Sequence, residues 1–141
     1  MNDCSLNIPE LMHAFDLRPD KRLGQNFLID QSALLKVVQA AKIEAEDTIL
    51  EIGPGLGSLT CLLASQARRV VAVELDQRLI PALQHVISPF SNVQIIQGDI
   101  LQVNLTEIMQ KPGYLVVANI PYYITSNLIR QLLETQMAPR R

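Results

Sequence analysis

Four short apolar segments alternate with helix-like segments along most of the chain, and this alternation limits the possible folds more than any other feature of the sequence. The apolar segments predict strands at residues 48–52, 69–75, 93–97 and 114–118. Strands that are apolar along their length and separated by helices indicate a parallel sheet that is covered on both faces. We therefore predict an α/β fold, a Rossmann-like, doubly wound parallel sheet in which each strand is followed by a helix.

Helices are predicted between these strands and in front of the first one, at residues 8–15, 31–43, 58–66, 77–87, 105–110 and 124–134. Asp30 has the side chain of a helix N-cap, and Pro81 fits a helix only in its first turn or at a kink. Helical spacing in the second helix places four apolar residues on one face: Leu34, Leu35, Val38 and Ala41. Four strands leave such a sheet partly built, with an open edge on the last strand, so we expect the fold to be truncated after that strand and its helix.

Composition places the chain among ordinary folded domains. It has 141 residues, of which 48% are hydrophobic and 18% charged, and this balance excludes a disordered chain. The net charge of -2 argues against a wholly basic nucleic-acid-binding protein. No apolar run is long enough to cross a membrane and the N-terminus lacks the pattern of a secretory signal, so we expect a cytoplasmic protein with no membrane partner. The cysteines and histidines are scattered, which predicts no metal site.

A glycine-rich loop, GPGLG at residues 53–57, follows the first predicted strand. Parallel sheets bind ligands beyond the carboxyl ends of their strands, and glycines let the backbone turn tightly and approach a ligand. The dinucleotide fingerprint GxGxxG has its third glycine one position later, where this chain has Ser58. The GxGxG spacing therefore favours a ligand without a pyrophosphate, and a purely structural turn is the alternative.

Acidic residues follow the second and third predicted strands. Glu74 lies about 20 residues beyond the glycine loop, where a carboxylate can accept hydrogen bonds from ribose hydroxyls. Asp99, followed by Ile100, could accept a hydrogen bond from an adenine amino group. The alternatives are a solvated strand-end charge at Glu74 and a turn-forming aspartate at position 99.

The segment NIPYY at residues 119–123 ends the fourth predicted strand and is the most specific local signal. Asn119 supplies a side-chain acceptor and two donors, and Tyr122 a flat face on which a base can stack. Pro121 stiffens the turn and leaves neighbouring carbonyls such as that of Ile120 available as acceptors. Together these residues predict a pocket for a planar group that carries an amino group, with a structural turn as the alternative.

Five segments of the chain together resemble the KsgA/RsmA family of ribosomal RNA adenine dimethyltransferases: KRLGQNFL at 21–28, EIGPGLG at 51–57, VELD at 73–76, GDI at 98–100 and NIPYYITS at 119–126. The similarity spans residues 18–135. The resemblance implies a methyltransferase fold, S-adenosylmethionine as cofactor and adenine N6 as methyl acceptor. It assigns the cofactor contacts to Asn26, Leu28, Gly53, Gly55, Glu74, Asp99, Ile100 and Asn119.

The same resemblance implies small-subunit ribosomal RNA and the pre-ribosomal small subunit as partners. It divides the chain into a segment 1–28 that covers the cofactor site and a partial methyltransferase domain 29–141, without the helical C-terminal domain of full-length family members. We expect a monomer. Two basic groups could contact RNA phosphates, or could be solvated surface charges: Arg18, Lys21 and Arg22, and Arg140 with Arg141.

A mechanism follows for the segment at 119–122. Tyr122 would stack on an adenine that has left its own stack, while the Asn119 side chain and the Ile120 carbonyl would accept the two hydrogens of N6. Other interpretations are a different amino methyltransferase with an Asn/Asp-Pro-Pro-Tyr loop, a non-catalytic cofactor- or RNA-binding module of the same fold, and a nicotinamide-dependent oxidoreductase. Ile120 in place of the first proline disfavours the first of these, and the GxGxG spacing disfavours the third.

Overall fold

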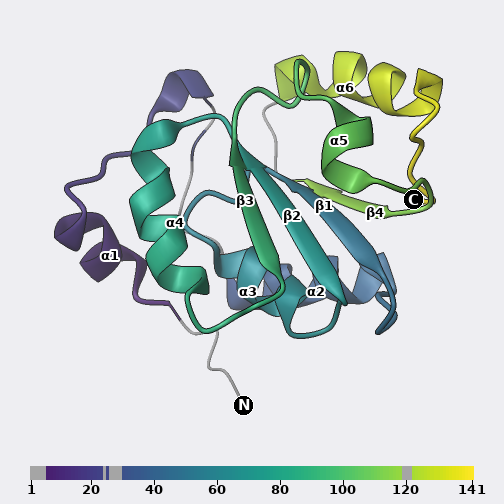
Figure 1. Ribbon diagram of the computed structural model, residues 1–141. Coiled ribbons are helices and arrows are strands. Elements are labelled where there is room, and N and C mark those ends of the chain that lie inside the picture. Colours follow the sequence, from purple (N-terminus) through teal and green to yellow (C-terminus); the bar gives the residue numbers. More distant parts are fainter. Residues whose placement is uncertain (1–5, 24, 26–29, 119–121) are drawn as a thin grey trace.

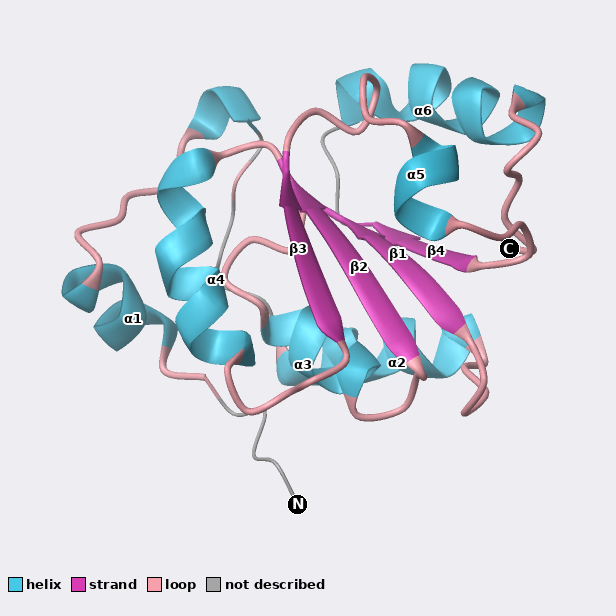
Figure 2. Cartoon of the chain, viewed as in Figure 1, coloured by secondary structure: helices cyan, strands magenta, loops and turns pink. Residues whose placement is uncertain are grey.

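A parallel sheet lies at the centre of the computed structural model, which describes residues 6–23, 25, 30–118 and 122–141 (Figures 1 and 2). Its strands are β1 (Thr48–Ile52), β2 (Arg69–Glu74), β3 (Val93–Gln97) and β4 (Leu115–Ala118). They lie in the order β3-β2-β1-β4, and each neighbouring pair is parallel. The chain thus moves outward from β1 to β3 and then returns to place β4 on the other side of β1. The predicted doubly wound sheet is confirmed.

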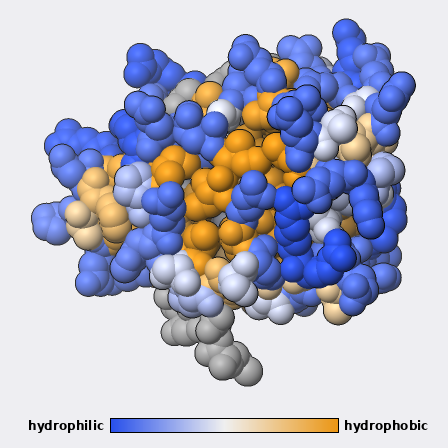
Figure 3. Space-filling model, viewed as in Figure 1, coloured by the Kyte–Doolittle hydropathy of each residue, from blue (hydrophilic) through white to orange (hydrophobic). Residues whose placement is uncertain are grey.

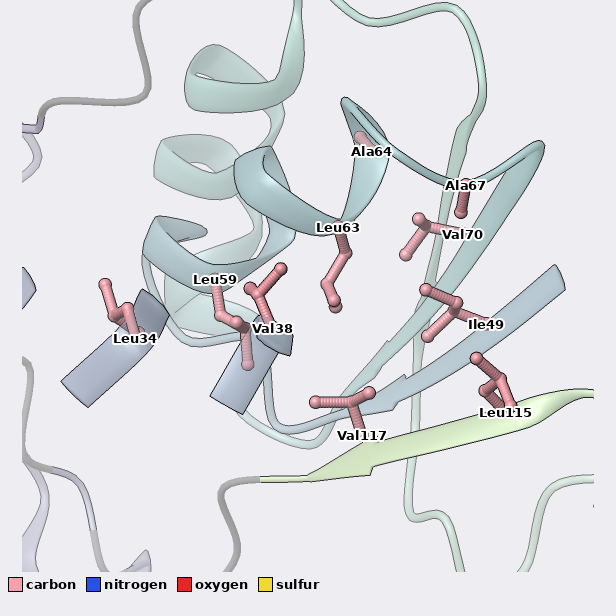
Figure 4. Close-up of a cluster of buried hydrophobic side chains, with 10 residues drawn as sticks. All are labelled: Leu34, Val38, Ile49, Leu59, Leu63, Ala64, Ala67, Val70, Leu115 and Val117. Carbon is pink, nitrogen blue, oxygen red and sulfur yellow. The ribbon is translucent and has the colours of Figure 1, made fainter. Parts of the chain in front are cut away.

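Helices cover both faces of this sheet (Figure 2). On one face lie α2 (Gln31–Ala41), α3 (Ser58–Ala64) and α4 (Ile80–Ile87), and on the other lie α5 (Leu105–Met109) and α6 (Tyr122–Glu134). Alternate strand residues point to opposite faces, so β1 supplies Ile49 to the first layer and Leu50 to the second. The first layer forms a buried apolar cluster between α2, α3 and the strands: Leu34, Val38, Ile49, Leu59, Leu63, Ala64, Ala67, Val70, Leu115 and Val117 (Figure 4).

The N-terminal segment packs on the outside of α4. Its helix α1 (Ile8–Ala14) lies beside α4 (Figure 1) and is followed by a short 3-10 helix η1 (Lys21–Leu23). Leu17 is buried with Leu56 of the glycine loop and with Leu79 and Ala82, and apolar side chains of α1 pack against this cluster. The N-terminal segment is therefore held next to the glycine loop by apolar contacts.

The observed helices differ from the predicted ones mainly at their ends. The predicted helix 77–87 is a 3-10 turn, η2 (Gln77–Leu79), followed by α4, and Pro81 lies in the first turn of α4 as its chemistry requires. Asp30 caps α2 as predicted, by accepting a hydrogen bond from the Ser32 N–H group. The last helix begins at Tyr122 rather than at residue 124.

The prediction that Leu35 shares the buried face of its helix is wrong. Leu35 is 45% exposed, whereas Leu34 and Val38 are buried and Ala41 is half-buried. A helix turns by about 100° per residue, so a residue next to Leu34 lies off a narrow contact stripe. The buried face of α2 is therefore narrower than its sequence suggests.

The two edges of the sheet differ. At β4, residues 138–141 run alongside the strand: the Arg140 N–H donates to the Tyr114 carbonyl at 2.7 Å and the Val116 N–H donates to the Arg141 carbonyl at 2.7 Å. The last strand thus has a partly paired edge, where an open one was predicted. At β3, Val93, Ile95 and Ile96 are only half-buried, and apolar surface gathers over this strand between α4 and α5 (Figure 3).

No helix in the described part of the chain is long and apolar enough to cross a lipid bilayer.

Candidate functional site

The carboxyl ends of the parallel strands meet at one edge of the sheet, and the predicted site residues follow these ends. The strand order reverses between β1 and β4, since the chain leaves β1 for β2 on one side and comes back to β4 on the other. Ligands of open α/β sheets bind in the crevice at such a point. The fold therefore selects this edge as the candidate site.

The glycine loop between β1 and α3 depends on its glycines. Gly53, Gly55 and Gly57 have φ angles of 72°, 59° and 92°, in the left-handed region that side chains disfavour. The Gly53 N–H donates to the Val73 carbonyl at 3.0 Å, which ties the loop to β2. A Cβ at Gly57 would lie 2.9 Å from Val86 Cγ1 on α4. The first two glycines shape the loop, and the third lets α3 and α4 pack closely.

Glu74, the last residue of β2, joins this loop to the turn that follows its own strand. Its Oε1 accepts a hydrogen bond from the Gly55 N–H at 3.0 Å, and its Oε2 accepts one from the Asp76 N–H at 2.8 Å. Burial raises the pKa of the Glu74 carboxyl, and these two hydrogen bonds oppose the increase. Each carboxylate oxygen has a further lone pair, so the group can still accept hydrogen bonds from two neighbouring hydroxyls.

A second carboxyl group, that of Glu51 in β1, comes shortly before the same loop in the chain and was not predicted as a site residue. Glu51 is 2% exposed, and its Oε1 accepts a hydrogen bond from the Thr60 hydroxyl of α3 at 2.5 Å. Burial raises the pKa of Glu51 to about 8; the Thr60 hydrogen bond opposes this, and the charge of Glu74 adds to it. Glu51 is therefore largely neutral near pH 7, and the region next to Glu74 carries less negative charge than its sequence indicates.

Asp99 and Ile100 follow β3, as predicted, but both have structural contacts. Asp99 is half-buried, and its Oδ1 accepts a hydrogen bond from the Leu101 N–H at 2.9 Å, while its carbonyl accepts from the N–H groups of Gln102 and Val103. Ile100 is 5% exposed and belongs to the apolar cluster beneath α5 and α6. The turn-forming role weighed for Asp99 is thus present, and contacts of both residues with an adenine ring stay predictions.

Several predicted site residues lie outside the described part of the chain. These are Asn26, Leu28, Asn119, Ile120 and Pro121. The next residue, Tyr122, opens α6 instead of belonging to the loop. The contacts of these residues with cofactor and base are therefore predictions that rest on the sequence.

Sequence reasoning missed a polar link between the N-terminal segment and the turn after β2. Gln25 Nε2 donates to Asp76 Oδ2 at 2.9 Å, and Gln25 Oε1 accepts from the Asp20 N–H at 2.8 Å. The Asp76 carboxylate also accepts from the Arg78 N–H and its guanidinium, the latter at 2.6 Å. Gln25 and Asp76 are 51 positions apart, and their residue types alone give no signal of contact.

Three of the basic residues predicted to contact RNA, namely Arg22, Arg140 and Arg141, have partners within the fold. Arg140 pairs with the buried Asp47 at 3.0 Å, and Arg141 Nη2 donates to the Lys42 carbonyl at the end of α2 at 2.8 Å. Arg22 pairs with Asp20 at 3.3 Å. Arg140 and Arg141 thus stabilise the fold, and a role for either basic group in RNA binding stays a prediction. Among the described residues, no cluster of histidine, cysteine and carboxylate side chains could hold a metal ion.

Comparison with known proteins identifies the family of the chain. A family model described as "Ribosomal RNA adenine dimethylase" matches residues 17–141. The chain belongs to this family. The resemblance seen in the sequence and the S-adenosylmethionine-dependent methyltransferase fold are both confirmed, and the nicotinamide-dependent oxidoreductase is set aside.

Members of the ribosomal RNA adenine dimethylase family and related structures give the extent of the match. The chain is 43% identical over 129 residues to the ribosomal RNA small subunit methyltransferase A of Clostridium botulinum, covering 91% of this chain and 47% of that protein. The crystal structure of a dimethyladenosine transferase from Plasmodium falciparum has a TM-score of 0.70 and 31% identity, covering 80% of this chain and 40% of that one. The 23S rRNA methyltransferase ErmE has a TM-score of 0.69 and 32% identity, covering 80% and 45%. The chain thus spans slightly less than half the length of its curated relatives.

Proposed function

We propose that this chain is the cofactor-binding part of an enzyme that transfers methyl groups from S-adenosylmethionine to adenine N6 in small-subunit ribosomal RNA. One observation carries the proposal: the Glu74 carboxylate is held beside the glycine loop by the N–H groups of Gly55 and Asp76. This arrangement offers a hydrogen-bond acceptor for a ribose next to a backbone that a ligand can approach closely.

The described residues fit the cofactor. Gly53 and Gly55 are half-exposed and carry no side chain at the point where the methionine part would approach, and Glu74 retains acceptor capacity for two ribose hydroxyls. When bound, S-adenosylmethionine supplies an activated methyl group. We propose that Asn26, Leu28, Asp99, Ile100 and Asn119 complete the contacts.

The target base would bind at the segment that follows β4. We propose that Tyr122 stacks on the adenine, while the Asn119 side chain and the Ile120 carbonyl accept the N6 hydrogens and Pro121 keeps that carbonyl in place. Hydrogen bonds to both N6 hydrogens orient the nitrogen lone pair and stabilise the transition state more than the ground state. Holding the amino group in line can lower the barrier by several kcal/mol. The methylated N6 then carries a positive charge and releases one proton to water, so no strong general base is required.

The proposed substrate is small-subunit ribosomal RNA in a pre-ribosomal particle, which is supported by the name of the Clostridium relative. The name of ErmE gives 23S rRNA as the substrate of that protein, so the choice of RNA needs a direct test. We further propose a cytoplasmic monomer in which residues 1–28 cover the cofactor site of a methyltransferase domain formed by residues 29–141. The second candidate is a cofactor- or RNA-binding module of the same fold without transfer activity.

Calorimetric titration with S-adenosylmethionine tests the cofactor site. The same titration is run with S-adenosylhomocysteine and with an analogue that lacks both ribose hydroxyls, on the chain and on its Glu74→Gln variant. Hydrogen bonds to a charged group predict that the chain prefers the ribose form by at least tenfold and that the variant loses most of this preference. Equal preference in both proteins would remove Glu74 from ribose recognition, and no binding by a folded chain would refute the cofactor site.

Methyl transfer is tested in a full-length relative at the position matching Asn119. Replacement by alanine is expected to abolish transfer to small-subunit RNA while cofactor binding and the unfolding temperature change little. Transfer at the unmodified rate would refute the proposed role. Cofactor binding by the present chain, without transfer by any full-length relative, would select the binding module.

A further inference from the structure

We propose that Gln25 and Asp76 are positioning residues of the cofactor site, which fix the Glu74 carboxylate by tying the N-terminal segment to the turn after β2. This inference rests on the proposed function, since it concerns how the chain prepares the ribose-binding carboxylate. Neither residue is among the predicted cofactor contacts.

The link is a continuous series of hydrogen bonds. Gln25 accepts from the Asp20 N–H through Oε1 and donates to Asp76 through Nε2, at 2.8 and 2.9 Å. The Asp76 N–H in turn donates to Glu74 Oε2 at 2.8 Å, and Glu74 Oε1 accepts from the Gly55 N–H at 3.0 Å. The series therefore begins in the N-terminal segment and ends in the glycine loop.

The turn after β2 is the part of this series that sets the position of Glu74. The Asp76 N–H is one of the backbone donors that hold the Glu74 carboxylate, and the Gly55 N–H is another. The Asp76 side chain fixes that backbone by capping η2, where it accepts from the Arg78 N–H at 3.0 Å. Movement of Asp76 would thus move a donor of the carboxylate that is expected to bind the ribose.

The charges around Asp76 explain why an amide suits position 25. The Asp76 side chain is 6% exposed, and Arg78 holds its pKa well below the usual range, with Gln25 contributing in the same direction. Among the described residues, the charged groups that face this cluster, besides Glu74, are Asp20, Arg22 and Arg78. A glutamine can accept from Asp20 and donate to the Asp76 carboxylate at once, whereas a glutamate would place a second negative charge against it.

The apolar contacts of the N-terminal segment supply an independent anchor. Leu17 is buried with Leu56 of the glycine loop and with Leu79 at the end of η2. Loss of the Gln25 link would therefore leave the segment attached and Asp76 still capping η2, but the turn after β2 would lose its hydrogen bond to the N-terminal segment and gain freedom to move. For this reason the variants are expected to keep their fold.

Four variants test the inference: Gln25→Ala, Gln25→Glu, Asp76→Asn and the double variant Gln25→Glu/Asp76→Asn. S-adenosylhomocysteine is titrated into each, and the unfolding temperature is measured alongside. Gln25→Glu is expected to weaken binding at least tenfold, because its carboxylate faces that of Asp76. The double variant is expected to bind within threefold of the unmodified chain, because the amide now at position 76 can donate to the carboxylate now at position 25. Gln84→Ala on the exposed side of α4 is the control and should bind normally.

Amide hydrogen exchange distinguishes positioning from a general loss of stability. In Gln25→Ala the N–H groups of Asp76 and Gly55 are expected to exchange faster, while those in β1 and β3 keep their protection. Single variants that bind within twofold of the unmodified chain, or a double variant as weak as Gln25→Glu, would overturn the inference. If the folded, unmodified chain does not bind S-adenosylhomocysteine, the proposed function fails instead, and the exchange of the Asp76 amide still decides whether Gln25 fixes this turn.

Discussion

The buried carboxyl group of Glu51 makes the stability of the chain depend on pH in a direction that is unusual for a carboxylate. Its pKa rises from an ordinary 4.5 to about 8 in the folded chain because burial disfavours its charge. Between these pH values the folded chain keeps a proton that the unfolded chain has released. The contribution of the Glu51 carboxyl to the free energy of unfolding is therefore fully present below pH 4.5 and is lost as the pH rises towards 8.

The size of the effect follows from linkage. One proton contributes at most about 1.4 kcal/mol per pH unit, so an increase from pH 5 to pH 8 can cost roughly 3 to 4 kcal/mol. This is a large part of the roughly 5 to 15 kcal/mol that stabilises a typical domain. Glu51→Gln keeps the shape of the side chain and an acceptor for the Thr60 hydroxyl, and it cannot ionise.

Urea unfolding at pH 5, 6, 7 and 8 measures this difference. The free energy of unfolding of Glu51→Gln should stay close to that of the unmodified chain at pH 5 and exceed it by about 2 to 4 kcal/mol at pH 8. Glu74, whose pKa is also raised, leaves a smaller pH dependence in the variant. Glu46→Gln at an exposed position serves as the matched control. Parallel curves for the unmodified chain and Glu51→Gln would refute the reasoning.

Three further predictions concern packing, charge and base binding. Gly57→Ala should destabilise the chain by about 2 to 4 kcal/mol in urea unfolding, because the new Cβ clashes with α4 and the φ angle is unfavourable for alanine. Gly113→Ala is the control: Gly113 has a φ of 84° but open space around it, so this variant should lose only about 1 to 2 kcal/mol. Equal losses of stability in the two variants would contradict the packing argument. Arg140→Ala should lower the unfolding temperature because it leaves the buried Asp47 without its ion pair, and an unchanged temperature would mean that the pair contributes nothing. In a full-length relative, replacing the residue that matches Tyr122 by phenylalanine should retain much of the transfer rate and replacing it by alanine should not; equal rates would exclude stacking.

The sheet and its helices could be predicted from the sequence because the spacing of apolar residues indicates strands and helices directly, and glycines mark the loops between them. Even so, the spacing of apolar residues placed Leu35 on the buried face of α2. That spacing shows which way a helix face points, but not how wide a stripe of the helix is in contact with the rest of the fold. The start of α6 at Tyr122 was missed for a related reason: aromatic residues after a proline suit a loop as well as a first helical turn.

The candidate site was predictable only where a residue type and a strand end coincide. Glu74 beside the glycine loop is such a case. The Gln25–Asp76 link and the Glu51–Thr60 pair were not found, because both depend on which side chains the fold brings together. Nothing in the sequence around Gln25 or Thr60 indicates which distant side chain each of them contacts.

The register of the sheet has a consequence for how the molecule folds. In β1, Thr48 pairs with Arg69 of the next strand along the chain, whereas Ile49 pairs with Leu115 of β4, much further away in sequence. Closing the longer loop costs more chain entropy, so β4 is expected to join after β1, β2 and β3. The glycine loop and the Glu74 carboxylate, which come from β1 and β2, would then form before the segment after β4, where we propose that the base binds. Partial opening of the molecule should follow the reverse order, with β4 losing amide protection first.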